Sequence, residues 1–407
     1  MPASPSLLIV PARFKTGKLY TQIATTSAGL VLGSSGDFNV TRATTATRFN
    51  SAGLIESVAS GVPRLDYFTS GGTAGCPALL VEPSAQNLAL RSEQFDVSGT
   101  WTSVTGGTGA LPSVTANAVI SPDGTQNAET VLLNRGAGNA SADQSTLQQN
   151  VTLATSGTYI FSVYAKATAS GDVGKQIFLR IGGGGSLIAY TLTANWVRLT
   201  RTETGLASGS NLIQIGNRGG VTADNSVSVD LWGAQVEAGS IATSYIPTTT
   251  GSVTRNADVV TLSGAVSGCI GQTEGTIYLD LTVLGKGSSS ATSWVQIFGP
   301  SNNIGLAINS SNLFRSIVNT QSDTLLTAPL ISSGVKVAWA YDATGTTCFI
   351  NGTQYTLTTG GNQTMSSLTS ISIDGSANTA FGFARIRAAA LYNTRLTNAE
   401  LAALTTP

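Results

Sequence analysis

Apolar residues recur mainly at every second position, in short runs separated by Gly, Asn, Asp, Ser and Thr. This spacing is typical of strands with one buried face, because successive side chains of a strand point to opposite faces of a sheet. Clear examples lie at 158–166 and 275–283, and Asn351-Gly352 is the residue pair of a tight hairpin turn. A helical pattern occurs only near the C-terminus, where Thr397 and Glu400 have capping-box spacing. The pattern therefore predicts an all-β protein with one short helix.

The distribution of these runs divides the chain into four parts. Residues 1–85 have strand-like runs but few large apolar residues, so we expect a strand-rich anchoring and oligomerisation segment that pairs with neighbouring chains or with the rest of this one. Residues 86–240 carry strands at hairpin-like spacing and are expected to form a jelly-roll sandwich. An extended linker at 241–264 follows, because Pro247 favours extended backbone. Residues 265–407 are expected to form a second β-sandwich.

The stretch 229–258 is expected to join the jelly roll to the rest of the chain. Strict alternation along its strand predicts that Trp232 shares a face with Asp230, Ala234 and Val236 and lies in the jelly-roll interior. Residues 252–260 are expected to return toward the N-terminal segment before the second sandwich begins.

Composition narrows the possible functions. Charged residues make up 10% of the 407, against about 25% in ordinary soluble proteins, and 21 basic residues balance 21 acidic ones. With no basic run interleaved with aromatic residues, we expect neither nucleic-acid binding nor membrane insertion. The chain has no histidine, which excludes Ser-His-Asp catalysis and histidine-ligated zinc. Cys76, Cys269 and Cys348 are far apart, so neither a metal site nor a disulfide scaffold is expected, and Cys348 is predicted to be buried.

The first residues do not have the pattern of a signal peptide, because the apolar run at 7–10 has only four residues and no preceding positive region. No stretch of the sequence approaches the ~20 apolar residues of a membrane-spanning helix. We therefore expect a protein that is made in a cytoplasm and reaches the outside without the usual secretion signal.

Two resemblances arise at particular residues. The C-terminal part, with Lys336-Val-Ala-Trp-Ala-Tyr341, the hairpin at 349–352 and the closing run at 390–401, resembles concanavalin A-like (laminin-G-like) lectin sandwiches. The first 260 residues resemble tail- or fibre-associated virion proteins of tailed bacteriophages, on the runs at 41–56, 63–67, 79–83, 87–95, 232–248 and 254–258. The jelly roll is similar to carbohydrate-binding modules. These resemblances imply attachment to other virion proteins through the N-terminal part, display of both sandwiches and location in the virion. The poor N-terminal core, together with the usual symmetry of fibres, predicts a homotrimer.

In a glycan-binding protein, exposed tryptophans are candidate binding residues, because sugars stack on exposed aromatic rings. Trp101 follows a Gly-Thr turn and Trp294 follows Ser-Ala-Thr-Ser, so both are expected to be partly exposed and are the candidate glycan-binding residues. The other tryptophans are expected in cores, namely Trp196, Trp232 and Trp339.

Catalytic and metal sites are not indicated by the spacing of acidic residues. A glycosidase needs two carboxylates about 5–9.5 Å apart, whereas Asp280 stands alone on its strand with Glu274 six residues earlier. Jelly-roll modules often hold a structural calcium ion, for which oxygen ligands are available at Asp123, Glu129, Asp224 and Asp230, but no clustered Asp-x-Asp loop exists. We therefore expect no catalytic residue, no metal and no cofactor.

The sequence thus predicts a non-enzymatic structural protein of a phage tail, baseplate or fibre, whose outer lectin-like domain either binds host surface glycan or only shapes the appendage. Two alternatives remain open. One is a polysaccharide-degrading tail enzyme that uses dispersed carboxylates such as Asp280, and the other is a head decoration fibre.

Overall fold

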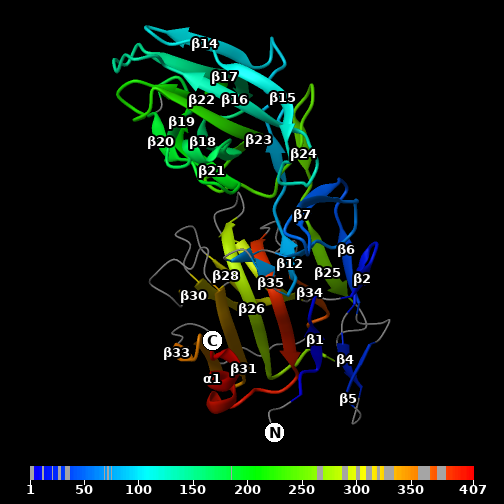
Figure 1. Cartoon of the computed structure of the whole chain (residues 1–407). Helices are drawn as coiled ribbons and strands as arrows, with labels where there is room; N and C mark the ends of the chain where they lie inside the picture. The colour runs from blue at the N-terminus through cyan, green and yellow to red at the C-terminus, as the bar shows by residue number, and fades with distance from the viewer. Residues whose placement is uncertain are drawn as a thin grey trace. The chain divides into compact units, whose positions relative to one another are not determined.

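The computed structural model describes residues 4–11, 13–20, 22–25, 29–32, 37–67, 69–70, 73–74, 76–184, 186–263, 269–286, 292–298, 303–308, 314–318, 321–324, 334–355, 367–373 and 382–407. Regular structure in these ranges is almost entirely β-strand, which confirms the predicted all-β class (Figure 1). The chain forms two compact units. The terminal unit comprises Met1–Gly53, Ser57–Ser84 and Asn256–Pro407, and the central unit comprises Leu54–Glu56 and Ala85–Arg255.

The terminal unit contains two large sheets. Sheet I has the order β33-β32-β31-β26-β35-β1-β4-β5, and β12 pairs with both β35 and β9. Its strands are β1 (Leu7–Ile9), β4 (Gln22–Thr25), β5 (Gly29–Leu32), β9 (Leu65–Asp66), β12 (Ala78–Val81), β26 (Gly275–Lys286), β31 (Gly334–Asp342), β32 (Gly345–Ile350), β33 (Thr353–Tyr355) and β35 (Gly382–Tyr392).

Sheet II has the order β2-β3-β6-β25-β34-β27-β28-β29-β30. Its strands are β2 (Phe14–Lys15), β3 (Lys18–Leu19), β6 (Phe38–Thr41), β25 (Val259–Ser263), β27 (Thr292–Phe298), β28 (Asn303–Ile308), β29 (Phe314–Val318), β30 (Gln321–Thr324) and β34 (Ser370–Ser372). Short strands outside both sheets are β7 (Ala46–Phe49), β8 (Ile55–Val58), β10 (Thr69–Ser70) and β11 (Thr73–Ala74).

Both ends of the chain build these sheets. Along one edge of β35, β1 pairs at Leu7 with Leu391 and β12 pairs at Leu79 with Ile386. Residues 1–85 are therefore not a structural unit of their own, and of the two expected kinds of pairing the structure shows pairing with the rest of this chain, while a role in anchoring stays a prediction. The strands of these residues are too short and too poor in large apolar residues for a core of their own, so they bury their apolar faces against the C-terminal strands.

The end of the predicted linker also belongs to this unit. β25 pairs with β6, with Val260 opposite Val40, which confirms that the chain returns to the N-terminal strands at this point. Together these strands enclose one apolar core, to which the N-terminal part contributes Leu7, Phe38 and Leu79, and the C-terminal part contributes Ile277 and Trp339.

The opposite face of sheet I is covered by helix α1 (Asn398–Thr405). The predicted capping box is present, since the Thr397 side chain accepts a hydrogen bond from the Glu400 amide and the Glu400 side chain accepts one from the Thr397 amide. Leu401 packs with Tyr278 and Phe349 on the sheet. Asn351 and Gly352 both have positive φ, at 48° and 79°, as a type I′ turn between β32 and β33 requires.

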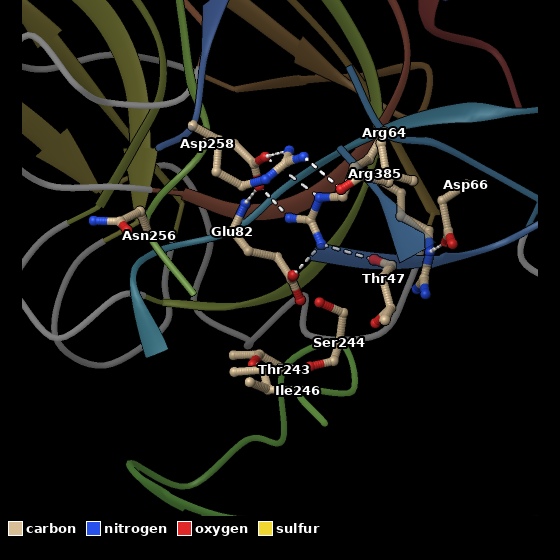
Figure 2. A network of polar contacts seen from close by, with 12 residues as sticks. Thr47, Arg64, Asp66, Glu82, Thr243, Ser244, Ile246, Asn256, Asp258 and Arg385 are labelled. Atoms are coloured by element: carbon tan, nitrogen blue, oxygen red, sulfur yellow. Dashed lines mark hydrogen bonds and ion pairs between the residues drawn. The ribbon is translucent and has the colours of Figure 1, made fainter. Parts of the chain in front are cut away.

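A buried network of charged side chains connects the N-terminal strands with the start of β25 (Figure 2). The Arg64 guanidinium binds both carboxylates of the network, at 2.6 Å from Glu82 Oε2 and through Nη2 to Asp258 Oδ2. Arg42 Nη1 lies 2.8 Å from the other oxygen of Asp258. Burial alone lowers the pKa of Arg64, but the charges of Asp258 and Glu82 more than offset this effect, and its pKa lies above the usual value. Two cations and two anions thus compensate one another away from water.

Removing one member of this network should be costly. Asp258→Asn leaves Arg42 and Arg64 facing a neutral group and should lower the free energy of unfolding of the terminal unit by about 3–5 kcal/mol. The control is Asp280→Asn, which removes an acid whose partner Arg387 is 39% exposed, and its expected cost is within about 1 kcal/mol. Urea unfolding followed by near-UV circular dichroism measures both. Equal losses in the two variants would show that the network is not a principal source of stability.

The central unit is the jelly-roll sandwich of two five-stranded sheets. Sheet III has the order β14-β17-β22-β19-β20, and sheet IV has the order β15-β16-β23-β18-β21 (Figure 1). Sheet III contains β14 (Thr102–Gly106), β17 (Gln144–Leu153), β19 (Gln176–Ile181), β20 (Ile188–Thr191) and β22 (Gly209–Arg218). Sheet IV contains β15 (Ser113–Val119), β16 (Ala128–Asn134), β18 (Gly157–Ala167), β21 (Val197–Leu206) and β23 (Ser226–Ala238). β13 (Ala85–Asn87) pairs with β24 (Val253–Arg255), and a 3₁₀ turn, η1, spans Ser170–Asp172.

Strand β23 changes face at Gly233, which corrects its predicted alternation. The register with β18 shifts between Ser162 and Tyr164, and Gly233 has a φ of 70°, as expected for a glycine at a β-bulge. As a result, the residues of β23 that enter the sandwich core are Val227, Val229, Leu231, Ala234 and Val236.

Trp232 is therefore buried, but on the outer face of sheet IV. Its ring centroid lies 4.4 Å from that of Tyr245 and 5.6 Å from that of Tyr164. The segment that carries Tyr245 had been predicted to be an extended linker. It instead covers this face, where Asn87 Nδ2 donates hydrogen bonds to the carbonyls of Ala234 and Ile246.

Candidate functional site

The outer face of sheet III combines polar side chains, an unpaired positive charge and a cavity. The inner face of this sheet is apolar, with Leu147, Ile215 and Leu179 fully buried in the core. Because side chains alternate along each strand, the residues between them face outward. The strand pairing arranges these outward residues in rows that cross the sheet.

The central row is made of Val104, Thr146, Gly216 and Phe178, each opposite the next on the neighbouring strand. A Cβ atom at Gly216 would lie 2.6 Å from Thr146 Oγ1 and 2.8 Å from Phe178 Cε1, so the Phe178 ring packs directly on the backbone of Gly216. Thr146 and Phe178 are fully buried although they lie on the outer face. In the part of the chain that the structure describes, Thr146 Oγ1 has no hydrogen-bond partner.

The next row is polar and runs through Thr102, Gln148, Gln214 and Arg180. Gln214 Nε2 donates to Gln148 Oε1 at 2.9 Å, and Arg180 Nη1 donates to Gln214 Oε1 at 3.3 Å. Arg180 Nε also donates to the Gly182 carbonyl at 3.0 Å. These bonds hold two amides and one guanidinium side by side across three strands.

A cavity of about 170 Å³ lies at the Thr102 end of this row. It is lined by Leu90, Gly99, Thr100, Thr102, Gln148, Gln149 and Asn150. One wall is fixed by Gln149, whose side chain accepts a hydrogen bond from the Leu90 amide at 2.7 Å and donates one to the Leu90 carbonyl at 2.9 Å. A cavity needs a volume of roughly 10–15 Å³ to hold one water molecule. A cavity of about 170 Å³ therefore has room for a small polar ligand.

Two arginines face outward from neighbouring strands of this sheet. Arg180 lies on β19, and Arg218 lies at the end of β22, where its Nε donates to the Ser141 carbonyl at 2.6 Å. Burial, and then repulsion by the charge of Arg218, lower the pKa of Arg180. Among the described residues neither guanidinium forms an ion pair.

The residues predicted to bind glycan are not part of this face. Trp101 was expected to be partly exposed, and this is wrong, because it is 3% exposed and packs with Phe95 at a centroid distance of 4.9 Å. Its Nε1 donates to the Arg91 carbonyl, so the segment before β14 folds back over the indole. Trp294 lies in β27, and its side chain is outside the part of the chain that the structure describes.

The other tryptophans follow the sequence prediction in part. Trp339 is buried in the terminal unit, as predicted. Trp196 is half-exposed rather than in the core, because it lies just before β21 on the outer face of sheet IV. There the Lys166 ammonium lies 5.4 Å from its ring centroid, and its Nε1 donates to the Ile120 carbonyl.

The acidic residues considered for calcium have separate local roles. Asp123 accepts hydrogen bonds within its own turn from Ser121 and Thr125, Asp224 accepts one from the Gln176 amide, and Asp230 pairs with Lys166 at 2.8 Å. Within the described ranges no group of three or more His, Cys, Asp or Glu side chains could hold a metal ion. In the terminal unit, Asp280, the acid considered for catalysis, accepts a hydrogen bond of 2.8 Å from Arg387 Nε.

The cysteines and the described helices add no further site. Cys76, Cys269 and Cys348 are free thiols, and Cys348 is buried as predicted. Burial raises the pKa of the Cys348 thiol well above its usual range. No helix in the described part of the chain has the length and apolar character needed to cross a membrane.

Glu129 is a buried acidic residue whose surroundings strongly disfavour its charged form. It is buried on the inner side of β16, opposite Leu231 of β23. Burial, together with the neighbouring carboxyl of Asp96, raises its pKa from 4.5 to about 8. Glu129 is therefore protonated in the folded protein at neutral pH.

This raised pKa predicts a pH dependence of the central unit. Between about pH 4.5 and pH 8 the unfolded chain releases the Glu129 proton while the folded unit retains it, so stability should fall as pH rises through this window. Glu129→Gln should flatten the dependence, because glutamine stays neutral at every pH. Thermal unfolding midpoints measured from pH 5 to pH 8 test this, and an unchanged slope in the variant would assign the dependence to another group.

Comparison with known proteins assigns no family and no function to this chain. No protein-family model and no curated protein sequence matches the chain. Solved structures similar to it include the CBM40 domain of the Ruminococcus gnavus IT-sialidase bound to α2,3-sialyllactose, at 17% identity over 33% of this chain and 83% of that chain, with a TM-score of 0.28. Another is Trypanosoma rangeli sialidase in complex with the inhibitor DANA, at 11% identity over 96% of this chain and 82% of that chain, with a TM-score of 0.30.

These neighbours correct one prediction. The sequence predicted that the protein is not an enzyme, and the sialidases among its structural neighbours contradict that prediction, which is withdrawn. Likeness at this level of identity and TM-score assigns no activity, substrate or residue role to this chain.

Proposed function

We propose that the protein binds carbohydrate on the outer face of sheet III. The observation that carries the proposal is the hydrogen-bonded row of Gln148, Gln214 and Arg180 that leads into the 170 Å³ cavity. Amides both donate and accept hydrogen bonds and a guanidinium donates several, so such a row suits the hydroxyl groups of a sugar. The cavity offers a recess at its end, where Thr102 and Asn150 add further polar groups.

We further propose that this binding serves a virion appendage of a tailed phage that attaches to host surface glycan. The resemblance of the runs at 41–56, 232–248 and 254–258 to tail- and fibre-associated proteins supports this setting, as does a chain with only 10% charged residues. A homotrimer is not part of the proposal. Its basis was an N-terminal segment without a core, and the strands of that segment pair within this chain.

Filling the cavity should abolish binding. Asn150 is exposed on β17 and lines the cavity, so Asn150→Trp should weaken binding of the full chain to its best ligand on an array of bacterial envelope glycans by about tenfold or more. Thr152→Trp is the matched control, since Thr152 is exposed on the same face of the same strand but does not line the cavity. Equal binding by both variants and the wild type would place the binding site elsewhere, and no ligand for the wild type would contradict carbohydrate binding itself.

A further inference from the structure

We propose that the saccharide bound by sheet III carries an anionic group, a carboxylate or a sulfate ester, and that Arg180 and Arg218 bind this group. The inference rests on the proposed carbohydrate-binding function and specifies its ligand class. It is drawn from the placement of these two side chains and from the hydrogen-bond donors they leave unused.

The two arginines flank the central row of the sheet. Arg180 lies two positions beyond Phe178 on β19, and Arg218 lies two positions beyond Gly216 on β22, with Phe178 and Gly216 paired between them. Both side chains are half-buried, and the intervening Phe178 ring is fully buried against Gly216. The charge of Arg218 is one of the two causes that lower the pKa of Arg180, after burial.

Arg180 and Arg218 both have N–H groups that donate no hydrogen bond to another described residue. Arg180 employs Nε and Nη1, toward Gly182 and Gln214, and Arg218 employs Nε, toward Ser141. Among the described residues, Arg180 Nη2 and both terminal nitrogens of Arg218 have no partner. Thr146 Oγ1, which lies opposite Gly216 on β17, also has no hydrogen-bond partner in the described part of the chain.

Electrostatics favours an anion over a neutral group at this place. Two like charges brought together without a counter-ion repel each other, and a ligand anion would remove that repulsion. The chain as a whole has no net charge, with 21 basic and 21 acidic residues, so this positive face is a local arrangement rather than a property of the whole surface. Guanidinium groups bind carboxylate and sulfate oxygens through paired, charge-assisted hydrogen bonds.

Nucleic acid is a weaker candidate for the same face. Its binding depends on many phosphate contacts along an extended basic surface, whereas this face has two arginines among amide and hydroxyl groups. The adjoining cavity and its polar lining fit a substituted sugar ring better than a charged backbone.

Titration calorimetry of the full chain tests the inference with four probes: polygalacturonate, the same polymer with its carboxyls reduced to alcohols, a sulfated galactan, and a single-stranded DNA oligonucleotide. We expect binding to at least one anionic polysaccharide, weakened about tenfold or more by Arg180→Gln and by Arg218→Gln. Arg201→Gln is the matched control, because Arg201 lies on sheet IV and pairs with Glu203. Unchanged thermal unfolding midpoints show that the variants fold.

Three results would overturn the inference. Equal affinity for the acidic and the reduced polymer, unaffected by both arginine variants but lost in Asn150→Trp, would remove the anionic specificity and leave the proposed function in place. Tighter, arginine-dependent binding of the oligonucleotide would assign the face to nucleic acid. Loss of affinity in Arg201→Gln equal to that in the other two variants would indicate a general effect of net charge.

Discussion

The buried contact between Arg64, Glu82 and Asp258 is the interaction on which the terminal unit depends (Figure 2). It joins Arg64 to Asp258, which lies 194 positions away in the sequence. Hydrogen bonds from the backbone amides of Glu82 and Asp258 connect the same two segments. The Glu82 amide donates to Asp258 Oδ2 at 3.0 Å, and the Asp258 amide donates to the Glu82 carbonyl at 3.0 Å. Glu82 lies shortly before the central unit begins and Asp258 shortly after it ends. One clamp therefore fixes the points where the chain leaves and re-enters the terminal sandwich.

This clamp explains how a large jelly roll can occupy the middle of the chain without disturbing the sandwich built from the two ends. Burying a charged side chain is unfavourable unless opposite charges compensate it. The two acids, Glu82 and Asp258, and the two arginines, Arg42 and Arg64, must therefore all be present. Asp66, bound by Arg385 of β35 and by the Phe49 amide, adds a second polar connection between the N-terminal part and the C-terminal strand. Short strands with little apolar surface are thereby held at the edge of β35.

Much of the local structure was predictable from the sequence, because it depends on neighbouring residues. Alternation located most strands, Asn351-Gly352 gave the hairpin turn, and Thr397 with Glu400 gave the helix start. Which strands pair was not predictable, since local periodicity does not reveal that Leu7 lies beside Leu391. The side-chain directions in β23 were missed because a glycine in a run of alternating residues does not by itself indicate a bulge.

The candidate site, too, was only partly predictable from the local sequence pattern. Gln148, Gln214 and Arg180 each occupy an outward position that alternation predicts, but only strand register brings them into one row. Trp101 follows a turn and so was expected near the surface, whereas the chain after Phe95 folds back and buries it. Sequence separation between the strands hides the first arrangement, and the turn pattern near Trp101 does not show that the chain folds back in the second.

Hydrogen–deuterium exchange of the native full chain tests the central claim, that the two ends of the chain form one folding unit, most directly. Amides in β1, β12 and β35 should open with a common free energy, because these strands share one sheet and one core. Asp258→Asn should lower that opening free energy by the same amount in all three strands. Fast exchange in β1 and β12 while β35 remains protected would contradict the claim and show an N-terminal segment that only associates with a separately stable C-terminal sandwich.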